Sequence, residues 1–280
     1  EMCKITLLAL IKFEGDNMFK TILLEKEKGW LNIWLNRPAS RNALSEEMVS
    51  ELKSVLIDTR ADESIRGITL RGKEKMFCAG GDLKGFKAVF QNPNTSRAEI
   101  EDASAEIGIL LNLLNTMPQV VVTLVEGAAV AGGMGLMCCG DVVITTTDAF
   151  FSLTETTLGI PPAQIAPFVM ARIGLSNSRR LMLTASRFDG IEAHRIGLAD
   201  LTVDNADDFI SVMDKIKRGV FSSAPKANAK TKALLFRALS LNTEDFRSYA
   251  AKTFTDCMLD GEGLEGVASF IEKRKPSWTL

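Results

Sequence analysis

The sequence predicts an α/β core followed by a helical tail. Short apolar stretches with strand character alternate with amphipathic helical stretches up to about residue 205, the pattern typical of an α/β protein. After Asp204 the strand patterns stop, and apolar residues recur only at helical spacing. The chain has 280 residues, 46% of them hydrophobic, which is enough for one large core with an appended region. We therefore predict a core over residues 18–205 and a helical region over 206–280.

The predicted core opens with two strands, at residues 21–24 and 30–35, on either side of a turn at Gly29. Pro38 ends the second strand, and Ser45 is expected to cap the helix that follows. Further strands are expected at residues 67–72, 120–125, 141–145 and 199–203. Further helices are expected at residues 103–114, 133–139, 176–184 and 191–196 in the core, and at 207–220, 226–239, 243–259 and 263–273 in the tail.

Composition and charge exclude several classes of function. The formal net charge is -2, so the chain lacks the basic excess of a nucleic-acid-binding protein. The longest apolar stretches, residues 5–11 and 120–125, are far shorter than the roughly 20 residues that span a membrane. The single histidine, His194, lies in a helical stretch where we expect a structural role, which argues against a histidine-rich metal site or a Ser-His-Asp triad. We predict no metal, no nucleic-acid partner and no membrane partner.

The five cysteines and the N-terminus indicate where the protein resides. The cysteine count is odd and contains no CxxC pair, which indicates free thiols in a reducing compartment and predicts a cytoplasmic protein. Met18 begins a stretch that looks like a natural start, so residues 1–17 are interpreted as an extension. That segment lacks the small-residue cleavage site of a signal peptide and is left out of the fold prediction.

Two turns rich in small residues, at 77–82 and 127–133, give the first indication of chemistry. Each follows a predicted strand, and small residues let the backbone approach a ligand closely. Two such turns could direct two N–H groups at one oxygen, as an enolate or a tetrahedral oxyanion requires. Taken alone, turns of this kind more often only reverse the chain. A phosphate loop is disfavoured because no Lys-Ser or Lys-Thr follows the glycines, and the GxGxxG spacing of a dinucleotide site is absent.

A series of short motifs then follows in a specific order. They are Leu35-Asn36-Arg37-Pro38, Asn42-Ala43-Leu44, Phe77-Cys78-Ala79-Gly80-Gly81-Asp82-Leu83, Ala131-Gly132-Gly133, Asp141, Glu155, Gly159 and Gly197-Leu198. In this order they resemble the enoyl-CoA hydratase/isomerase (crotonase) superfamily, from about Met18 to the end of the chain. The resemblance implies a crotonase-like ββα spiral core and a C-terminal helical trimerisation region, in a homotrimer or a hexamer formed by two trimers. It also implies an acyl-CoA thioester as substrate, with coenzyme A belonging to the substrate and no separate cofactor.

The resemblance implies roles for individual residues. The N–H groups of Ala79 and Gly132 would form the oxyanion hole that holds the thioester oxygen. Arg41 would take the place of a lysine that relatives set beside the coenzyme A phosphate. Phe270 and Lys273 lie in a stretch that reaches a neighbouring subunit's coenzyme A in relatives. The residues expected to line the substrate path are Ala39, Arg41, Ala79, Gly80, Gly81, Asp82 and Leu83.

The carboxylates decide which reaction the site performs. A typical hydratase of this superfamily uses two glutamates, one to activate water and one to manage the proton at Cα. Glu155 falls at the second position, but Gly135 stands where the first glutamate is expected. Because glycine has no side chain to hold a water molecule, proton transfer would rest on Glu155. In an apolar pocket its pKa would be raised; the alternative is that Glu155 is a solvated loop acid.

The loop at residues 159–169 bears on the subgroup. It departs from the Gly-Gly-Gly-Thr ending of relatives and, together with Gly135, resembles the isohexenylglutaconyl-CoA hydratases of acyclic-terpene degradation. Gln164 in this loop is expected either to face the acyl group, where it could meet a second carboxylate, or to cap a helix.

Three functions remain open at this point. The leading hypothesis is hydration of an α,β-unsaturated acyl-CoA of branched or glutaconyl type. The second is a Δ3,Δ2-enoyl-CoA isomerase, which needs only one base to move a proton between C2 and C4. The third is a weakly catalytic paralogue that binds coenzyme A esters. The acyl group, and the choice between trimer and hexamer, are left open by the sequence.

Overall fold

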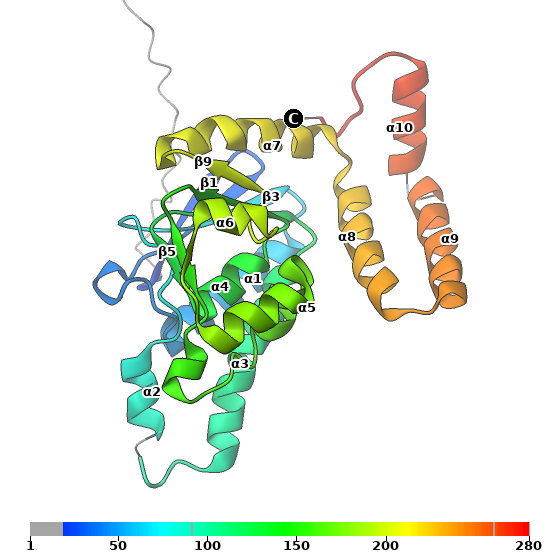
Figure 1. Cartoon of the computed structure of the whole chain (residues 1–280). Helices are drawn as coiled ribbons and strands as arrows, with labels where there is room; N and C mark the ends of the chain where they lie inside the picture. The colour runs from blue at the N-terminus through cyan, green and yellow to red at the C-terminus, as the bar shows by residue number, and fades with distance from the viewer. Residues whose placement is uncertain (1–18, 91, 260, 280) are drawn as a thin grey trace, which may run out of the picture.

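The computed structural model of the chain describes residues 19–90, 92–259 and 261–279, as an α/β core with helices at its C-terminal end (Figure 1). The predicted extension at residues 1–17 lies outside the described residues. In the described part of the chain, no helix combines the length and the apolar character needed to cross a membrane.

The core is built on a six-stranded sheet with the strand order β1-β2-β3-β4-β6-β9. β1 and β2 form an antiparallel hairpin around Gly29, whose φ of 72° suits glycine, and the remaining pairs are parallel. The predicted strands of this sheet are confirmed, with ends shifted by up to three residues. Their bounds are Ile22–Glu27 (β1), Trp30–Leu35 (β2), Gly67–Gly72 (β3), Val120–Val125 (β4), Val142–Thr146 (β6) and Leu201–Val203 (β9).

A second, three-stranded sheet was not predicted, because its strands are too short to give a periodic pattern. β5 (Ala128–Val130) pairs in parallel with β7 (Phe150–Ser152), which pairs antiparallel with β8 (Phe188–Asp189). Cys78 joins the edge of this sheet through an isolated bridge to Ala129. The second sheet therefore brings the two turns rich in small residues next to each other.

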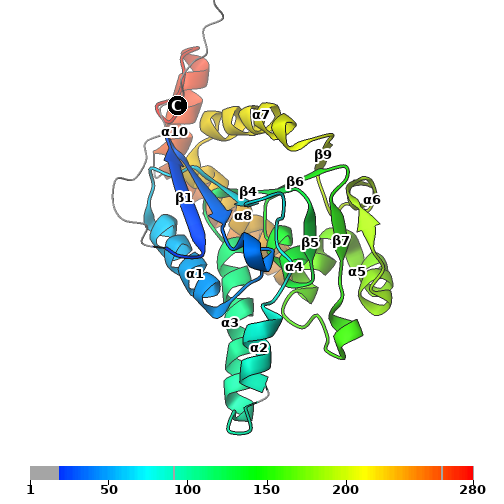
Figure 2. The same cartoon turned by 90° about the vertical axis from the view of Figure 1, so that its left-hand side faces the viewer.

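Helices cover one face of the six-stranded sheet. α1 and α3 pack against each other there, and α4 and α5 continue the layer (Figures 1 and 2). Ser45 caps α1 as predicted, since its hydroxyl accepts a hydrogen bond from the Met48 N–H. The bounds are Glu46–Ala61 (α1), Leu83–Phe90 (α2), Arg97–Asn115 (α3), Gly132–Cys138 (α4), Ala166–Thr184 (α5) and Gly190–Arg195 (α6).

Two of these helices differ from the sequence prediction. α2 was not predicted, because its eight residues directly follow a glycine-rich motif and show too little of a helical pattern. α5 begins at Ala166 instead of residue 176, so part of the predicted loop is helical. Gly174, with φ 71° and ψ 167°, kinks α5 in the middle and hides its continuity in the sequence.

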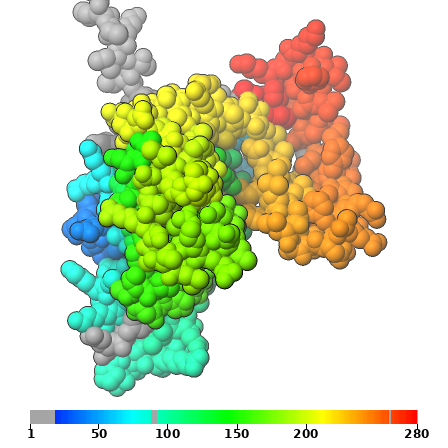
Figure 3. Space-filling model, in the orientation of Figure 1, coloured from blue at the N-terminus to red at the C-terminus, as the bar shows by residue number. Residues whose placement is uncertain are grey.

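The C-terminal region forms the four predicted helices, and the first of them packs on the core. α7 (Phe209–Ser222) covers the other face of the sheet, where Phe209 and Met213 share a buried cluster with Trp30 of β2. Three helices then extend beyond the core (Figures 1 and 3): α8 (Pro225–Ser240), α9 (Thr243–Leu259) and α10 (Glu262–Ile271).

One lysine ties this helical arm to the core. Lys232 of α8 is mostly buried, and its ammonium group donates to the Asp141 carboxylate and to the Gln119 carbonyl oxygen at 2.8 Å. The Asp141 carboxylate also accepts from the Val121 N–H at 2.7 Å, so it joins the arm to the start of β4. Because the Lys232 ammonium is mostly buried, losing the Asp141 carboxylate would leave it without its counter-charge, so this contact holds the root of the arm on the core.

Candidate active site

A chamber of about 670 Å³ lies between α2, α3, the start of α4 and the loop before α5. Most of its lining is apolar, and a few polar groups project from separate segments. The residues that line it are Leu44, Gly81, Leu83, Phe86, Ile100, Glu101, Ala103, Ser104, Ile107, Ala131, Gly132, Thr154, Glu155, Leu158, Ile160, Pro161, Pro162, Ala163, Gln164 and Ile165. A mainly apolar chamber with a few converging polar groups is the usual form of a small-molecule site.

Backbone hydrogen bonds hold the two small-residue turns together at the wall of this chamber. The Cys78 N–H donates to the Ala128 carbonyl oxygen at 3.0 Å, and the Val130 N–H donates to the Cys78 carbonyl oxygen at 3.0 Å. On the other side, the Leu44 N–H donates to the Gly80 carbonyl oxygen, and the Leu44 carbonyl oxygen accepts from the Asp82 N–H. The segment around Gly81 is thus paired on both sides, which fixes the direction of its N–H groups.

Two backbone N–H groups are left without an acceptor at this wall. In the described part of the chain, no oxygen accepts a hydrogen bond from the Gly81 N–H or the Gly132 N–H. Gly132 is the first residue of α4, a position whose N–H has no partner within the helix. A Cβ placed on Gly132 would stand 3.6 Å from the Gly81 nitrogen. The two donors therefore lie close together, and both line the chamber.

The prediction that Ala79 supplies one of these donors is wrong. The Ala79 N–H donates to the Arg41 carbonyl oxygen at 3.0 Å, and Ala79 does not line the chamber. Gly81 takes its place, two residues further along the same motif. The preceding Gly80 has a φ of 98°, a backbone conformation that residues other than glycine rarely adopt. This conformation changes the direction of the backbone between Ala79 and Gly81.

Glu155 is buried, so the reading of it as a solvated loop acid is wrong. It begins a short 3₁₀ helix at Glu155–Leu158, directly after β7, and is 9% exposed. Its Oε2 atom is buried without a hydrogen-bond partner among the described residues. Burial raises the pKa of the Glu155 carboxyl above its ordinary value. A buried carboxyl with a free oxygen in a ligand-sized chamber is a group suited to proton transfer near neutral pH.

Ile165 fills the space beside Gly135. A Cβ placed on Gly135 would lie 2.2 Å from Ile165 Cγ2 and 2.6 Å from Ile165 Cβ. Ile165 is 4% exposed and belongs to the main buried cluster. An apolar side chain from the loop before α5 therefore occupies the place where a typical hydratase would hold its first glutamate, and the second carboxylate that lines the chamber among the described residues, Glu101, is exposed.

Gln164 lines the chamber and does not cap a helix. α5 begins at Ala166, and no side chain caps its N-terminus. The Gln164 Nε2 donates to the Ser104 Oγ at 3.1 Å, while its Oε1 lies against Gly108 of α3. Of the two roles that the sequence left open, the structure supports the one in which Gln164 faces the chamber.

Of the residues predicted to line the coenzyme A path, Gly81 and Leu83 line the chamber. Leu83 is 56% exposed on α2 and reaches the chamber wall, and Ala39 and Arg41 are exposed on the neighbouring loop. The Asp82 carboxylate is already engaged, because Arg37 Nη2 donates to it at 2.9 Å. The Arg37 guanidinium holds the pKa of the Asp82 carboxyl below its ordinary value. This ion pair joins the two loops.

Two predicted residues lie far from the chamber within one copy of the chain. Phe270 is 85% exposed on α10, and Lys273 is exposed just after it, on the helical arm. His194 has the structural role expected of it, with its Nδ1 3.1 Å from the Ala199 carbonyl oxygen. Within the described ranges, no three His, Cys, Asp or Glu side chains come together in a way that could hold a metal ion.

The sequence prediction missed most of the apolar lining, and among the residues that it missed are Arg37, Phe86, Ser104 and Ile165. Phe86 covers Gly81, since a Cβ on Gly81 would lie 2.3 Å from the Phe86 ring. The predictions missed it together with α2. The sequence held one indication of Ile165. Glycine at position 135, in place of the expected glutamate, indicates that another side chain packs into that space.

The comparisons with known proteins agree with this geometry. The sequence profile of the enoyl-CoA hydratase/isomerase family matches residues 25–280, and the chain belongs to this family. Among solved structures it is similar to Pseudomonas aeruginosa AtuE, with 45% sequence identity, a TM-score of 0.90, and coverage of 93% of this chain and 100% of that one. The predicted crotonase fold, a mixed α/β core with a C-terminal helical region, is thereby confirmed.

Curated relatives include both hydratases and an isomerase. The chain is 28% identical to the crotonyl-CoA hydratase of Syntrophomonas wolfei, over 93% of this chain and 98% of that protein. It is also 28% identical to the peroxisomal Delta(3,5)-Delta(2,4)-dienoyl-CoA isomerase of Arabidopsis thaliana, over 94% of this chain and 97% of that protein. Family membership therefore leaves the reaction to be argued from the site.

The packing of Ile165 against Gly135 predicts a coupled pair of substitutions. Gly135→Ala forces a methyl group into the Ile165 side chain, and we expect a loss of about 1–3 kcal/mol in the free energy of unfolding. Ile165→Gly removes both contacting atoms, so the loss in the double variant should be smaller than the sum of the two single losses by most of the Gly135→Ala cost. Urea denaturation of the two single variants and the double variant measures the coupling. Gly85→Ala, at an exposed helical glycine with room for a methyl group, is the control and should be neutral or stabilising. Additive effects of the two substitutions would contradict the packing.

Proposed function

We propose that the chamber binds an acyl-CoA thioester, with the thioester oxygen held by the Gly81 and Gly132 N–H groups. The observation that carries this proposal is the pair of adjacent backbone donors without acceptors, facing an apolar chamber that also contains Glu155. When an enolate forms, negative charge gathers on that oxygen. Fixed donors stabilise this charge without having to reorganise, and one such donor typically accounts for about 100- to 1,000-fold in rate.

Glu155 is proposed as the catalytic acid and base, and hydration of an α,β-unsaturated acyl-CoA as the reaction. Its carboxylate takes a proton from water as the hydroxyl adds to Cβ, and it returns a proton to Cα as the enolate collapses. One carboxylate can serve both steps because it regains its starting form after the second. The apolar Ile165 takes the space beside Gly135, and the other carboxylate that lines the described chamber, Glu101, is exposed and paired with Arg97, which leaves Glu155 as the buried carboxyl for both steps.

The second candidate is isomerisation of a 3-enoyl-CoA. The specific observation in its favour is the same Ile165 contact, since moving a proton between C2 and C4 needs one base and no bound water. The two reactions separate when the purified protein is given a 2-enoyl-CoA and, in parallel, a 3-enoyl-CoA. Hydration consumes the conjugated thioester and yields a hydroxyacyl product, whereas isomerisation creates the conjugated thioester and yields none.

The acyl group is proposed to be branched or of glutaconyl type. Two features support this: the resemblance of the loop at 159–169 to isohexenylglutaconyl-CoA hydratases, and the amide of Gln164, which lines the chamber beside the Ser104 hydroxyl. The proposed location is the cytoplasm. The four cysteines within the described residues, Cys78, Cys138, Cys139 and Cys257, carry free thiols, as a reducing compartment allows.

The third possibility, a paralogue that only binds coenzyme A esters, is tested by Glu155→Gln. We expect kcat to fall by about 100- to 10,000-fold while affinity for butyryl-CoA persists, because the change removes proton transfer and keeps the shape of the side chain. Glu101→Gln, at the exposed carboxyl that also lines the chamber, is the control and should leave kcat close to that of the natural chain. A Glu155→Gln variant with unchanged turnover would contradict the assignment.

The natural chain should show a pH dependence whose sign follows from the raised pKa of Glu155. Glu155 acts first as a base, so kcat/KM should rise as pH increases through a pKa above the usual carboxyl range. The folded state binds this proton more tightly than the unfolded state, so the group lowers stability as pH rises between the two pKa values. Glu155→Gln should therefore gain stability relative to the natural chain from acidic to neutral pH.

The helical arm is proposed to pack on neighbouring copies in a homotrimer, or in a hexamer if two trimers pair. Large apolar side chains are exposed along it: Leu235 65%, Leu239 84%, Phe254 68%, Leu259 76%, Leu264 59%, Phe270 85% and Ile271 71%. Such a surface is rare on a monomer and marks a protein contact. In the assembly, Phe270 and Lys273 would lie near the coenzyme A of a neighbour.

Analytical ultracentrifugation tests this assembly. We expect the natural chain to sediment as a trimer or a hexamer, and the double variant Leu239→Glu, Phe254→Glu to shift to smaller species, because each change puts a charge into an apolar contact. Thr255→Glu, at an exposed polar position on the same helix as Phe254, should leave the distribution unchanged. A natural chain that sediments as a monomer at micromolar concentration would contradict the proposal.

A further inference from the structure

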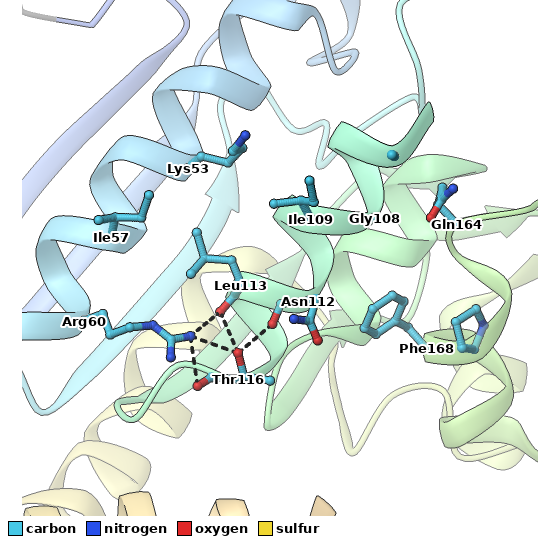
Figure 4. A pocket seen from close by; sticks show the side chains of 12 residues that line it. Lys53, Ile57, Arg60, Gly108, Ile109, Asn112, Leu113, Thr116, Gln164 and Phe168 are labelled. Carbon is cyan, nitrogen blue, oxygen red and sulfur yellow. Dashed lines mark hydrogen bonds between the residues drawn. The ribbon is translucent and has the colours of Figure 1, made fainter. Parts of the chain in front are cut away.

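A second cavity of about 710 Å³ begins where the chamber ends. It lies over the outer side of α3, with α1 on one side and the start of α5 on the other (Figure 4). The residues that line it are Lys53, Ile57, Arg60, Ala105, Gly108, Ile109, Asn112, Leu113, Thr116, Gln164, Pro167 and Phe168. Gln164 is the one residue in the described chain that lines both cavities. Its side chain marks the border between them.

Weak contacts hold Gln164 in this position. Its Nε2 makes a single hydrogen bond to the Ser104 hydroxyl, at 3.1 Å, and a neutral bond of this kind contributes little to stability. A Cβ placed on Gly108 would lie only 2.3 Å from the Gln164 Oε1, so any side chain at position 108 would push the amide away. Ser104 and Gly108 are one turn apart on the same face of α3. The Gln164 side chain therefore lies along α3 at the end of the chamber, and only one weak hydrogen bond would have to break for it to move.

The side chains of the second cavity are better suited to bind a hydrocarbon tail of the acyl group than a second carboxylate on it. Its two cations are already engaged. Lys53 is paired with Glu106, and Figure 4 shows the Arg60 guanidinium donating to the Leu113 and Thr116 carbonyl oxygens, at 3.2 and 3.1 Å. Apolar side chains between them remain open to solvent, with Ile57 56% and Ile109 49% exposed. An alkyl or prenyl tail would bury this surface.

We propose that Gln164 is a specificity gate for acyl chain length. Short acyl groups end inside the chamber with the gate closed. The tail of a longer chain displaces the Gln164 side chain, passes over Gly108 and lies on Ile109 in the second cavity. This inference rests on the proposed function, because it takes the chamber as the acyl site. It names the substrate class as acyl-CoA thioesters with long hydrocarbon tails.

Calorimetric binding of butyryl-CoA and dodecanoyl-CoA tests the gate without relying on turnover. The natural chain should bind dodecanoyl-CoA at least about tenfold more tightly, since each buried methylene adds about fourfold in affinity. Ile109→Lys puts a charge into the second cavity at an exposed position. It should weaken dodecanoyl-CoA binding by about tenfold or more and leave butyryl-CoA binding unchanged. Gln164→Ala should strengthen dodecanoyl-CoA binding, because the tail no longer has to displace the amide.

The control is Ala98→Lys, an exposed position on α3 outside both cavities, which should change neither affinity. The gate is overturned if Ile109→Lys and Gln164→Ala leave the ratio of the two affinities as it is in the natural chain. A natural chain that binds neither thioester instead overturns the proposed function itself. The two failures are therefore distinguishable in one set of titrations.

Discussion

The site depends on a short piece of backbone pairing between Cys78 and β5. The two hydrogen bonds that Cys78 exchanges with Ala128 and Val130 fasten the first small-residue turn to the second. Without them, the Gly81 and Gly132 donors would belong to separate loops, and their spacing would follow the motion of each loop. With them, both donors are fixed before any ligand arrives. Preorganisation of this kind makes a pair of N–H groups useful against developing negative charge.

The remaining chemistry is set by what the loop before α5 puts into the chamber. Ile165 fills the space beside Gly135, so in the proposed function a single buried carboxyl, Glu155, carries the proton transfer. The neighbouring Gln164 reaches the other way and meets Ser104 of α3. The two proposals thus assign separate roles to two adjacent residues of one loop, Ile165 for the reaction and Gln164 for the extent of the acyl site.

The sequence predicted most of the fold because its long elements carry clear periodic patterns. The parallel strands and the tail helices are recognisable from apolar spacing, and Ser45 from its position before two glutamates. β5 and β7 could not be predicted, since three residues give no period. The ordered motifs located both turns and Glu155, but they placed the first donor at Ala79. Only the hydrogen bond from Ala79 to Arg41 shows that this N–H is already used and that Gly81 is the free one. Ile165 was missed because its role depends on contact across the chamber.

A crystal structure with butyryl-CoA bound tests the central claim most directly. The quantity to measure is the distance from the thioester oxygen to the backbone nitrogens of Gly81 and Gly132. Both distances are predicted to lie within about 3.2 Å, the range of an N–H···O hydrogen bond. A thioester oxygen that contacts neither nitrogen, or that displaces Arg41 to reach the Ala79 N–H, would contradict the assignment of the oxyanion hole.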